Sequence, residues 1–213
     1  MNDSPIPDTA DWESQAGLPF CTYSTTPMGR EDFPVSCLLW ASAEAFCQFE
    51  GGDLPSEVQW EWVVAAAGRP NKTAFPWGGP DAESFPCSRG DFGRGYIASQ
   101  VAGPCIAVGL GPASVVDADH AGGDRSVGFG VVDLGYNMME WQKDEFDPLD
   151  SRCWMEQPLH ATACNDPANL VHSVRGGSWS SEPFEGAFPG RTGAPSVASS
   201  TEAGFRCVRK AVP

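Results

Sequence analysis

The stretch Arg175-Gly176-Gly177-Ser178-Trp179 closes the segment 171–179, whose residues fit a short strand that ends in a glycine turn. The segments 127–133 and 204–209 could each hold a further short strand. Elsewhere glycine and proline break the chain into short pieces, and the stretch 192–204 is predicted to be an exposed loop. This pattern predicts short strands joined by long loops.

A first helix is predicted upstream of these strands. Apolar residues recur at helical spacing at Trp40, Ala43, Phe46 and Cys47. The pair Gly51-Gly52 then ends the helix.

A second helix is predicted to begin at a capping box. The Ser56 oxygen is expected to accept the amide of Gln59, whose side chain reaches back to the Ser56 amide. The predicted apolar stripe consists of Val58, Trp62 and Ala65, with Trp60 on its flank and Gly68 as the stop.

The amino-acid composition excludes several classes of protein and of partner. Gly (24) and Pro (19) make up about a fifth of the 213 residues, which argues against a helical bundle and for a loop-rich α+β or all-β domain. The net charge of −15 repels phosphate backbones and anionic lipid, so we expect no nucleic-acid partner. No apolar run approaches the roughly 18 residues of a membrane-spanning helix, so we expect no membrane insertion.

Eight well-separated cysteines, without a close Cys-x-x-Cys pair, predict disulfides and an oxidising compartment. We therefore expect a secreted, periplasmic or cell-surface protein, whose signal was removed or which is a piece of a longer chain. The alternative is eight buried thiols in a cytosolic protein. His120, His160 and His172 are predicted to be solvated loop residues, because their spacing does not suggest a metal triad.

Several motifs follow one another in a fixed order. They are 38–47 (LLWASAEAFC), 51–57 (GGDLPSE), 60–62 (WEW), 75–78 (FPWG), 130–134 (GVVDL), 137–141 (NMMEW), 175–179 (RGGSW) and 204–207 (GFRC). This order resembles the formylglycine-generating enzyme, or sulfatase-modifying factor, family over about residues 36–209. The cysteine-rich style is similar to that of exported myxobacterial members.

The resemblance implies a C-type-lectin-like α+β fold with little regular secondary structure and long ordered loops. It places a formylglycine-generating-enzyme-like domain at 36–213. Residues 1–35 are then an irregular lead-in, too short for the strands with which family members usually begin.

The resemblance also identifies a missing metal site. The family's oxidases hold Cu(I) with two cysteines just after the RGGSW motif, since Cu(I) prefers thiolates. Here the first of these positions falls on Ser181 and the second within 184–189, where no cysteine stands. A serine hydroxyl stays protonated near neutral pH and binds Cu(I) poorly, so we expect no copper and no oxidase activity.

A structural Ca²⁺ is the cofactor that the resemblance implies instead. Asn137 matches a family ligand position, with Glu140 nearby, and Asp91 stands at a position of a second site. A loop-rich acidic domain can supply the six to eight oxygens that Ca²⁺ takes. The alternative for Asn137 is a turn residue that bonds its own backbone. The acidic stretch 116–124 is predicted to be an exposed loop.

The family also bridges a helix cysteine to one directly after the GFR motif, which here are Cys47 and Cys207. The other cysteines pair most simply as neighbours: Cys21–Cys37, Cys87–Cys105 and Cys153–Cys164. Six cysteines allow 15 connectivities, and the sequence alone does not choose among them.

We therefore expect a domain that binds a protein or another ligand through the loops 180–191 and 192–203. The candidate contact residues are Ser181, Phe184, Glu185, Phe188 and Arg191, because aromatic and guanidinium groups are enriched at binding hot spots. Trp179 is expected to be core. One alternative is an oxidoreductase with relocated chemistry, of the sulfatase-modifying or siderophore-maturation type. Another is a structural piece of a larger secreted assembly.

Overall fold

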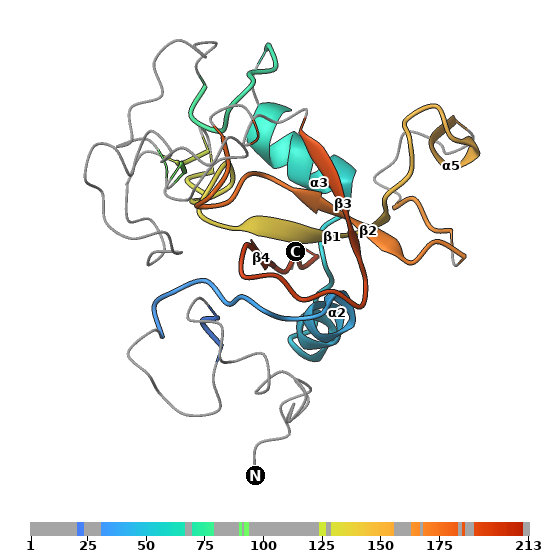
Figure 1. The fold of residues 1–213 in the computed structure, drawn as a ribbon. Helices are drawn as coiled ribbons and strands as arrows, with labels where there is room; N and C mark the ends of the chain where they lie inside the picture. The colour runs from blue at the N-terminus through green and yellow to red at the C-terminus, as the bar shows by residue number, and fades with distance from the viewer. Residues whose placement is uncertain are drawn as a thin grey trace.

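A small mixed sheet lies at the centre of the computed structural model (Figure 1). Its strands are β1 (Met139–Glu145), β2 (Val171–Arg175), β3 (Arg191–Pro195) and β4 (Ala203–Gly204), in the order β3-β2-β1-β4. The pairs β1–β2 and β2–β3 are antiparallel, whereas β4 runs parallel to β1. The described residues are 21–23, 31–66, 70–78, 90, 92–93, 124–126, 129–155, 163–166, 168–182, 185 and 190–210.

Among the described residues, few helices accompany the sheet. They are α2 (Trp40–Phe49), α3 (Glu57–Glu61), the π-helical turn η1 (Trp62–Ala66) and the short α5 (Arg152–Met155). Figure 1 shows α3 above the sheet and α2 below it. Few helices and a small mixed sheet are the low regular secondary structure that the sequence predicts.

Alternating side chains of β1 and β2 pack on opposite faces of the sheet, in two different cores. Trp141 and Val174 pack with Ala43 and Cys47 of α2. Their neighbour Glu140 instead accepts a hydrogen bond from the indole of Trp60 in α3. Successive strand residues point to opposite faces, so the sheet is covered by protein on both faces.

The first helix has the predicted bounds, and Gly51 follows it with φ +76°. The capping box of α3 is also present, with Ser56 accepting from the Gln59 amide and Gln59 accepting from the Ser56 amide. The predicted apolar stripe is confirmed at Ala65, which is buried, and is wrong at Val58 and Trp62, which are exposed, while Trp60 from its flank is buried. The hydrogen bond of Trp60 to Glu140 fixes this rotation, and the switch to π-helical turns at Trp62 breaks the 3.6-residue period.

The strand predicted at 171–179 exists over its first five residues. It stops at Gly176, whose φ is +79° and where a Cβ would lie 3.0 Å from the Leu134 carbonyl oxygen. Of the strand predicted at 204–209, only Gly204 lies in a strand, and Val208 forms an isolated bridge with Asp53.

The prediction of an exposed loop at 192–204 is wrong at both of its ends. Residues 192–195 belong to β3, which pairs residue by residue with β2, and 203–204 form β4. The sequence Arg-Thr-Gly-Ala-Pro has little strand propensity, but an edge position tolerates its proline.

The structure pairs Cys47 with Cys207, Cys21 with Cys37, and Cys153 with Cys164. These are three of the four pairs set out above. The fourth, Cys87 with Cys105, lies outside the described residues. The Cys47–Cys207 bridge joins α2 to the segment that follows β4.

Candidate functional site

A buried ionic cluster joins α3 to the sheet around Glu57. The carboxylate accepts hydrogen bonds from Arg191 at 2.6 Å (Nε to Oε2) and 2.7 Å (Nη2 to Oε1). Arg175 donates from Nη1 at 3.3 Å, and the Ser173 hydroxyl donates to Oε1. Glu57 is the first residue of α3, while its partners lie on β2 and β3, so the cluster fixes the helix start above the sheet.

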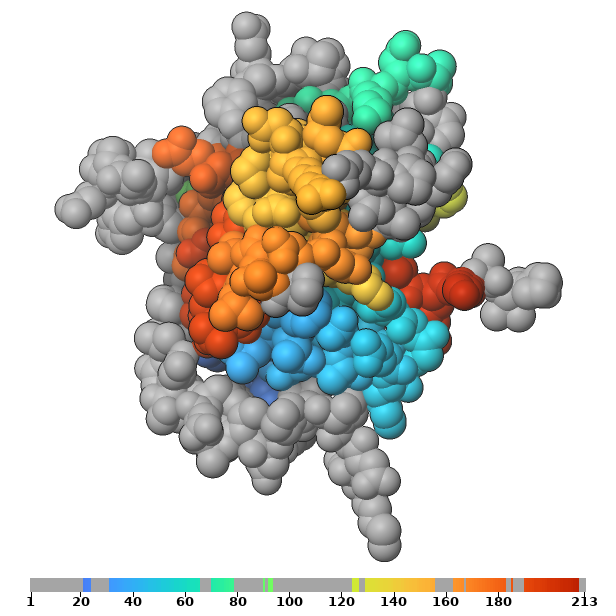
Figure 2. Space-filling model, turned by 90° about the vertical axis from the view of Figure 1, so that its right-hand side faces the viewer, coloured from blue at the N-terminus to red at the C-terminus, as the bar shows by residue number. Residues whose placement is uncertain are grey.

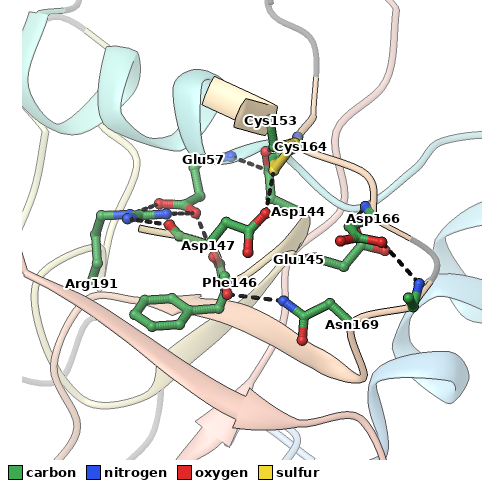
Figure 3. Close-up of a disulfide and its surroundings, with 12 residues drawn as sticks. Glu57, Asp144, Glu145, Phe146, Asp147, Cys153, Cys164, Asp166, Asn169 and Arg191 are labelled. Atoms are coloured by element: carbon green, nitrogen blue, oxygen red, sulfur yellow. Dashed lines mark hydrogen bonds and ion pairs between the residues drawn. A yellow bond between two sulfur atoms is a disulfide. The ribbon is translucent and has the colours of Figure 1, made fainter. Parts of the chain in front are cut away.

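A second buried carboxylate, Asp144, extends this cluster along β1 (Figure 3). Its oxygens accept the amides of Glu57 and Cys164, each at 2.7 Å. Burial raises the pKa of Asp144 to about 6, and the two amide bonds act in the opposite direction. Figure 3 also shows the Cys153–Cys164 disulfide beside Asp147, whose backbone oxygen accepts from Arg191.

Hydroxyl groups gather around Ser181, the residue to which the resemblance assigns a copper position. The Ser178 Oγ lies 3.2 Å from the Ser180 Oγ and 3.3 Å from the Ser181 Oγ, and it donates to Glu202 at 2.9 Å. Ser181 itself is buried and accepts the Ser178 amide. The described cysteines are all in disulfides, so no thiolate is available to this cluster from the described part of the chain.

Glu140, a predicted calcium ligand, is engaged by protein groups. Arg206 donates to both carboxylate oxygens, at 2.7 Å from Nε, and Trp60 donates at 3.0 Å. The Arg206 guanidinium also donates to the backbone oxygens of Val132 and Asp133. A cation at Glu140 would have to displace Arg206, so this carboxylate does not fit a calcium ligand in the arrangement described.

Asn137 is buried just before β1 and has a φ of +70°, a conformation that asparagine tolerates better than most residues. Its backbone oxygen accepts the amide of Trp179, which is buried as expected. Asp91, of the second predicted calcium site, lies outside the described residues. Calcium binding stays a prediction.

Of the three predicted contact residues that the structure describes, only Glu185 is exposed. Ser181 is buried, and the Arg191 guanidinium is committed to Glu57. Glu185 is exposed and accepts the Glu182 amide at 2.8 Å. Phe184 and Phe188 lie outside the described residues.

Two predicted loop residues are buried instead. His172 lies on β2 and stacks on the Trp40 ring at 3.7 Å between centroids, and burial lowers its pKa. Asp124, in the stretch predicted to be exposed, is buried and accepts the amides of Gly135 and Tyr136, each at 2.8 Å. Burial raises the pKa of Asp124 to about 7, against the lowering effect of these two bonds.

The sequence patterns do not predict that the carboxylates of Glu57, Asp144 and Asp124 are buried. Glu57 follows the N-cap Ser56, a position at which an acidic residue ordinarily serves the helix dipole from the surface. Asp144 stands in the run Lys143-Asp144-Glu145, which resembles a solvated strand end. Only the alternating directions of the side chains along β1 could have predicted that Asp144 is buried. That prediction would have required the knowledge that protein covers both faces of the sheet.

Comparison with known families gives one match over most of the chain. The model of the family described as "Sulfatase-modifying factor enzyme 1-like domain" matches residues 8–211.

Two curated proteins are similar in sequence. The chain is 29% identical over 119 residues to "Inactive C-alpha-formylglycine-generating enzyme 2" of Bos taurus, a match that covers 56% of this chain and 35% of that protein. It is 28% identical over 189 residues to "Formylglycine-generating enzyme" of Mycobacterium tuberculosis, covering 84% and 58%. The matches thus span between about a third and three fifths of the length of these relatives.

Similar solved structures share the fold at low identity. PvdO from Pseudomonas aeruginosa superposes with a TM-score of 0.60 at 18% identity, covering 86% of this chain and 62% of PvdO. Treponema denticola variable protein 1 gives a TM-score of 0.59 at 14% identity, covering 91% and 78%. At these identities the likeness concerns the fold alone.

Proposed function

The chain belongs to the sulfatase-modifying factor enzyme 1-like family, and from this premise we propose that it is a non-oxidase member that binds a protein or another ligand. An inactive paralogue among its relatives shows that the family includes proteins described as inactive. The binding surface we propose lies within residues 180–203, on the loop that precedes β3 and the loop that joins β3 to β4, displayed on a disulfide-braced scaffold.

The observation that carries this proposal is the chemistry at Ser181. Ser181, to which the resemblance assigns the first copper position, carries a buried hydroxyl that accepts the Ser178 amide. Its surroundings are other hydroxyls and the Glu202 carboxylate, which are hard oxygen donors. Cu(I) prefers soft thiolate ligands, so this cluster does not fit the copper ion of the oxidases.

The loop between Ser181 and Arg191 is anchored at both of its ends. At its start, the Trp179 amide donates to the Asn137 backbone oxygen and Ser181 is hydrogen-bonded to Ser178. At its end, Arg191 is clamped to Glu57. A loop held at fixed positions by a rigid scaffold is the arrangement in which binding residues are most often found.

The three disulfides among the described residues indicate an extracytoplasmic protein. No helix of the described residues is both long and apolar enough to cross a membrane. We propose that the protein acts in the secreted, periplasmic or cell-surface space, where the loops can meet an external ligand.

An oxidase assay tests the first half of the proposal. We expect a Cys-x-Pro-x-Arg peptide to keep its cysteine when incubated with this chain, Cu(I) and O2, as read by mass spectrometry. The Mycobacterium tuberculosis formylglycine-generating enzyme serves as the positive control. Appearance of the aldehyde with this chain would overturn the non-oxidase assignment.

A loop replacement tests the second half. Residues 183–189 are replaced by a Gly-Ser segment of equal length, and both proteins are used to capture partners from an envelope extract of the producing cells. We expect equal melting temperatures and the loss of at least one captured partner from the variant. Identical captures would show that the loop is not the binding surface.

The competing oxidoreductase needs a redox group elsewhere. Within the described part of the chain, the candidate metal-ligating cluster is Asp147 with Cys153 and Cys164. Because these two cysteines form a disulfide, they offer no thiolate. The described residues therefore favour binding over relocated redox chemistry.

A further inference from the structure

A groove of about 710 Å³ lies beside α3, away from the C-terminal loops. Its floor includes Trp60, Val63 and Leu134, which belong to one packed apolar cluster. The wall opposite α3 is the segment from Arg206 to Arg209 that follows β4.

Large apolar side chains at this groove are exposed to solvent. Val58 and Trp62, which are 43% and 51% exposed, line the groove, while Phe129, which is 56% exposed, lies beside Trp62 outside the lining. The rings of Trp62 and Phe129 lie 5.5 Å apart between centroids, so they form one continuous patch. Contiguous exposed apolar side chains, aromatic ones above all, mark interaction surfaces.

The helix geometry places the Trp62 side chain on the protein surface. At Trp62 the α-helix α3 passes into the π-helical turn η1, and such turns concentrate at functional sites. Trp60, two residues earlier, is buried against Glu140. The same short segment thus anchors one indole in the core and leaves the other on the surface.

A second pocket of about 800 Å³ continues the groove and brings positive charge to it. The two pockets share Gln59, Val208 and Arg209. The backbone bridge between Asp53 and Val208 fixes their common wall, with hydrogen bonds of 3.0 and 2.8 Å. Figure 2 shows this C-terminal segment, in red, beside the chain that follows α2, in cyan.

The net charge of the side chains that line the second pocket is positive, whereas the net charge of the whole chain is negative. Lys143, Arg209 and Lys210 line it together with only two carboxylates, Glu50 and Asp53. Those carboxylates pair with Arg209 and Lys143, and Lys210 makes no ion pair with any described residue. Because the chain as a whole carries a net charge of −15, this local excess of positive charge favours an acidic partner at the pocket.

We propose that this groove docks a peptide segment of a partner protein that carries large apolar side chains next to carboxylates. The apolar side chains cover Val58, Trp62 and Phe129, while the carboxylates meet Arg209 and Lys210. This surface is separate from the C-terminal loops of the proposed function, and it would stand if those loops proved to bind nothing.

The probe is the synthetic peptide acetyl-Glu-Glu-Phe-Leu-Glu-Glu-amide, titrated into the full chain by isothermal calorimetry. We expect saturable binding that weakens about tenfold or more in Trp62→Ser and in the double variant Arg209→Gln/Lys210→Gln. Replacing the four glutamates of the peptide by glutamine should have a similar effect. Leu149→Ser and Lys72→Gln are the matched controls, since they remove an exposed apolar and an exposed cationic side chain that do not line the groove.

Three results would overturn the proposal. They are no saturable binding up to about 1 mM peptide, equal binding of the glutamine peptide, and unchanged binding by Trp62→Ser with an unchanged melting temperature. Sedimentation adds a fourth, because a dimer of the wild-type chain that Trp62→Ser converts to monomer would assign the groove to a second copy of this chain.

Discussion

Arg191 and Glu57, which are 134 residues apart in sequence, form a two-point ion pair with distances of 2.6 and 2.7 Å. The pair links β3 to the start of α3 (Figure 3), and the Glu57 carboxylate also accepts from Arg175. The end of the proposed binding loop is therefore positioned by a helix that precedes it by more than half of the chain.

Glu57→Gln should destabilise the fold. The variant keeps the side-chain shape but leaves the buried Arg175 and the half-buried Arg191 without their shared negative charge. Breaking a buried ion pair from one side costs about 3–5 kcal/mol in free energy of unfolding, measured by urea denaturation. Glu50→Gln is the matched control, because its exposed pair with Arg209 should contribute at most about 1 kcal/mol. Equal losses in the two variants would refute the structural role of Glu57.

Removing the Cys47–Cys207 bridge should cost more than removing Cys153–Cys164. The sequence separations are 160 and 11 residues, for which the chain-entropy model gives about 5 and about 3 kcal/mol. Paired Cys→Ser variants and their melting temperatures check this order. Non-reducing peptide mapping checks the pairing itself, and a Cys47 peptide joined to another partner would contradict it.

Asp124 should make the stability fall as pH rises. Its pKa is raised from an ordinary value of 3.8 to about 7 in the folded state, mainly by burial. The folded state therefore holds the proton more tightly, and the stability that this group contributes is present below about pH 4 and is lost by about pH 7.

The Asp124→Asn variant isolates this effect, because its amide oxygen can still accept the Gly135 and Tyr136 amides. Relative to the variant, the wild type should lose about 4 kcal/mol of unfolding free energy between about pH 4 and about pH 7. A difference between the two proteins that does not change with pH would show that Asp124 titrates normally.

Glu140→Gln separates the two roles of Glu140. If the carboxylate serves Arg206 and Trp60, the variant lowers the melting temperature by the same amount in calcium and in a chelator. We expect this result, with a loss of about 3 kcal/mol from the broken pair. A loss that disappears in the chelator would make Glu140 a calcium ligand. A lower wild-type melting temperature in the chelator would still support calcium held elsewhere, since a ligand of the native state stabilises it.

The local elements of the fold could be predicted from the sequence. The capping box of Ser56 and Gln59 and the spacing from Trp40 to Cys47 depend on neighbours along the chain, and both helices begin where these signals stand. Strand β1 was missed because Glu140, Gln142 and Asp144 are buried by partners from α3, β2 and the C-terminal segment, so the strand has no apolar alternation.

The candidate site could be predicted only in part. The assignment of Ser181 to a copper position comes from the motif order, and it stays a prediction. The engagement of Glu140 by Arg206 does not follow from the sequence, because it depends on a contact across 66 residues. The exposure of Trp62, which the sequence predicts on the apolar stripe, does not follow either, since only the contact of Trp60 with Glu140 decides which of the two tryptophans turns inward.

The bridge from α2 to the segment after β4 sets the order in which the domain can be completed during synthesis. Ala203 and Cys207, which cover Ala43 and Cys47, follow them by 160 residues, so a chain leaving the ribosome presents α2 long before this cover is made. Until then the sheet lacks its edge strand β4, and the Cys47 thiol can mispair with the cysteines made between them. A disulfide isomerase should therefore speed the maturation of this domain.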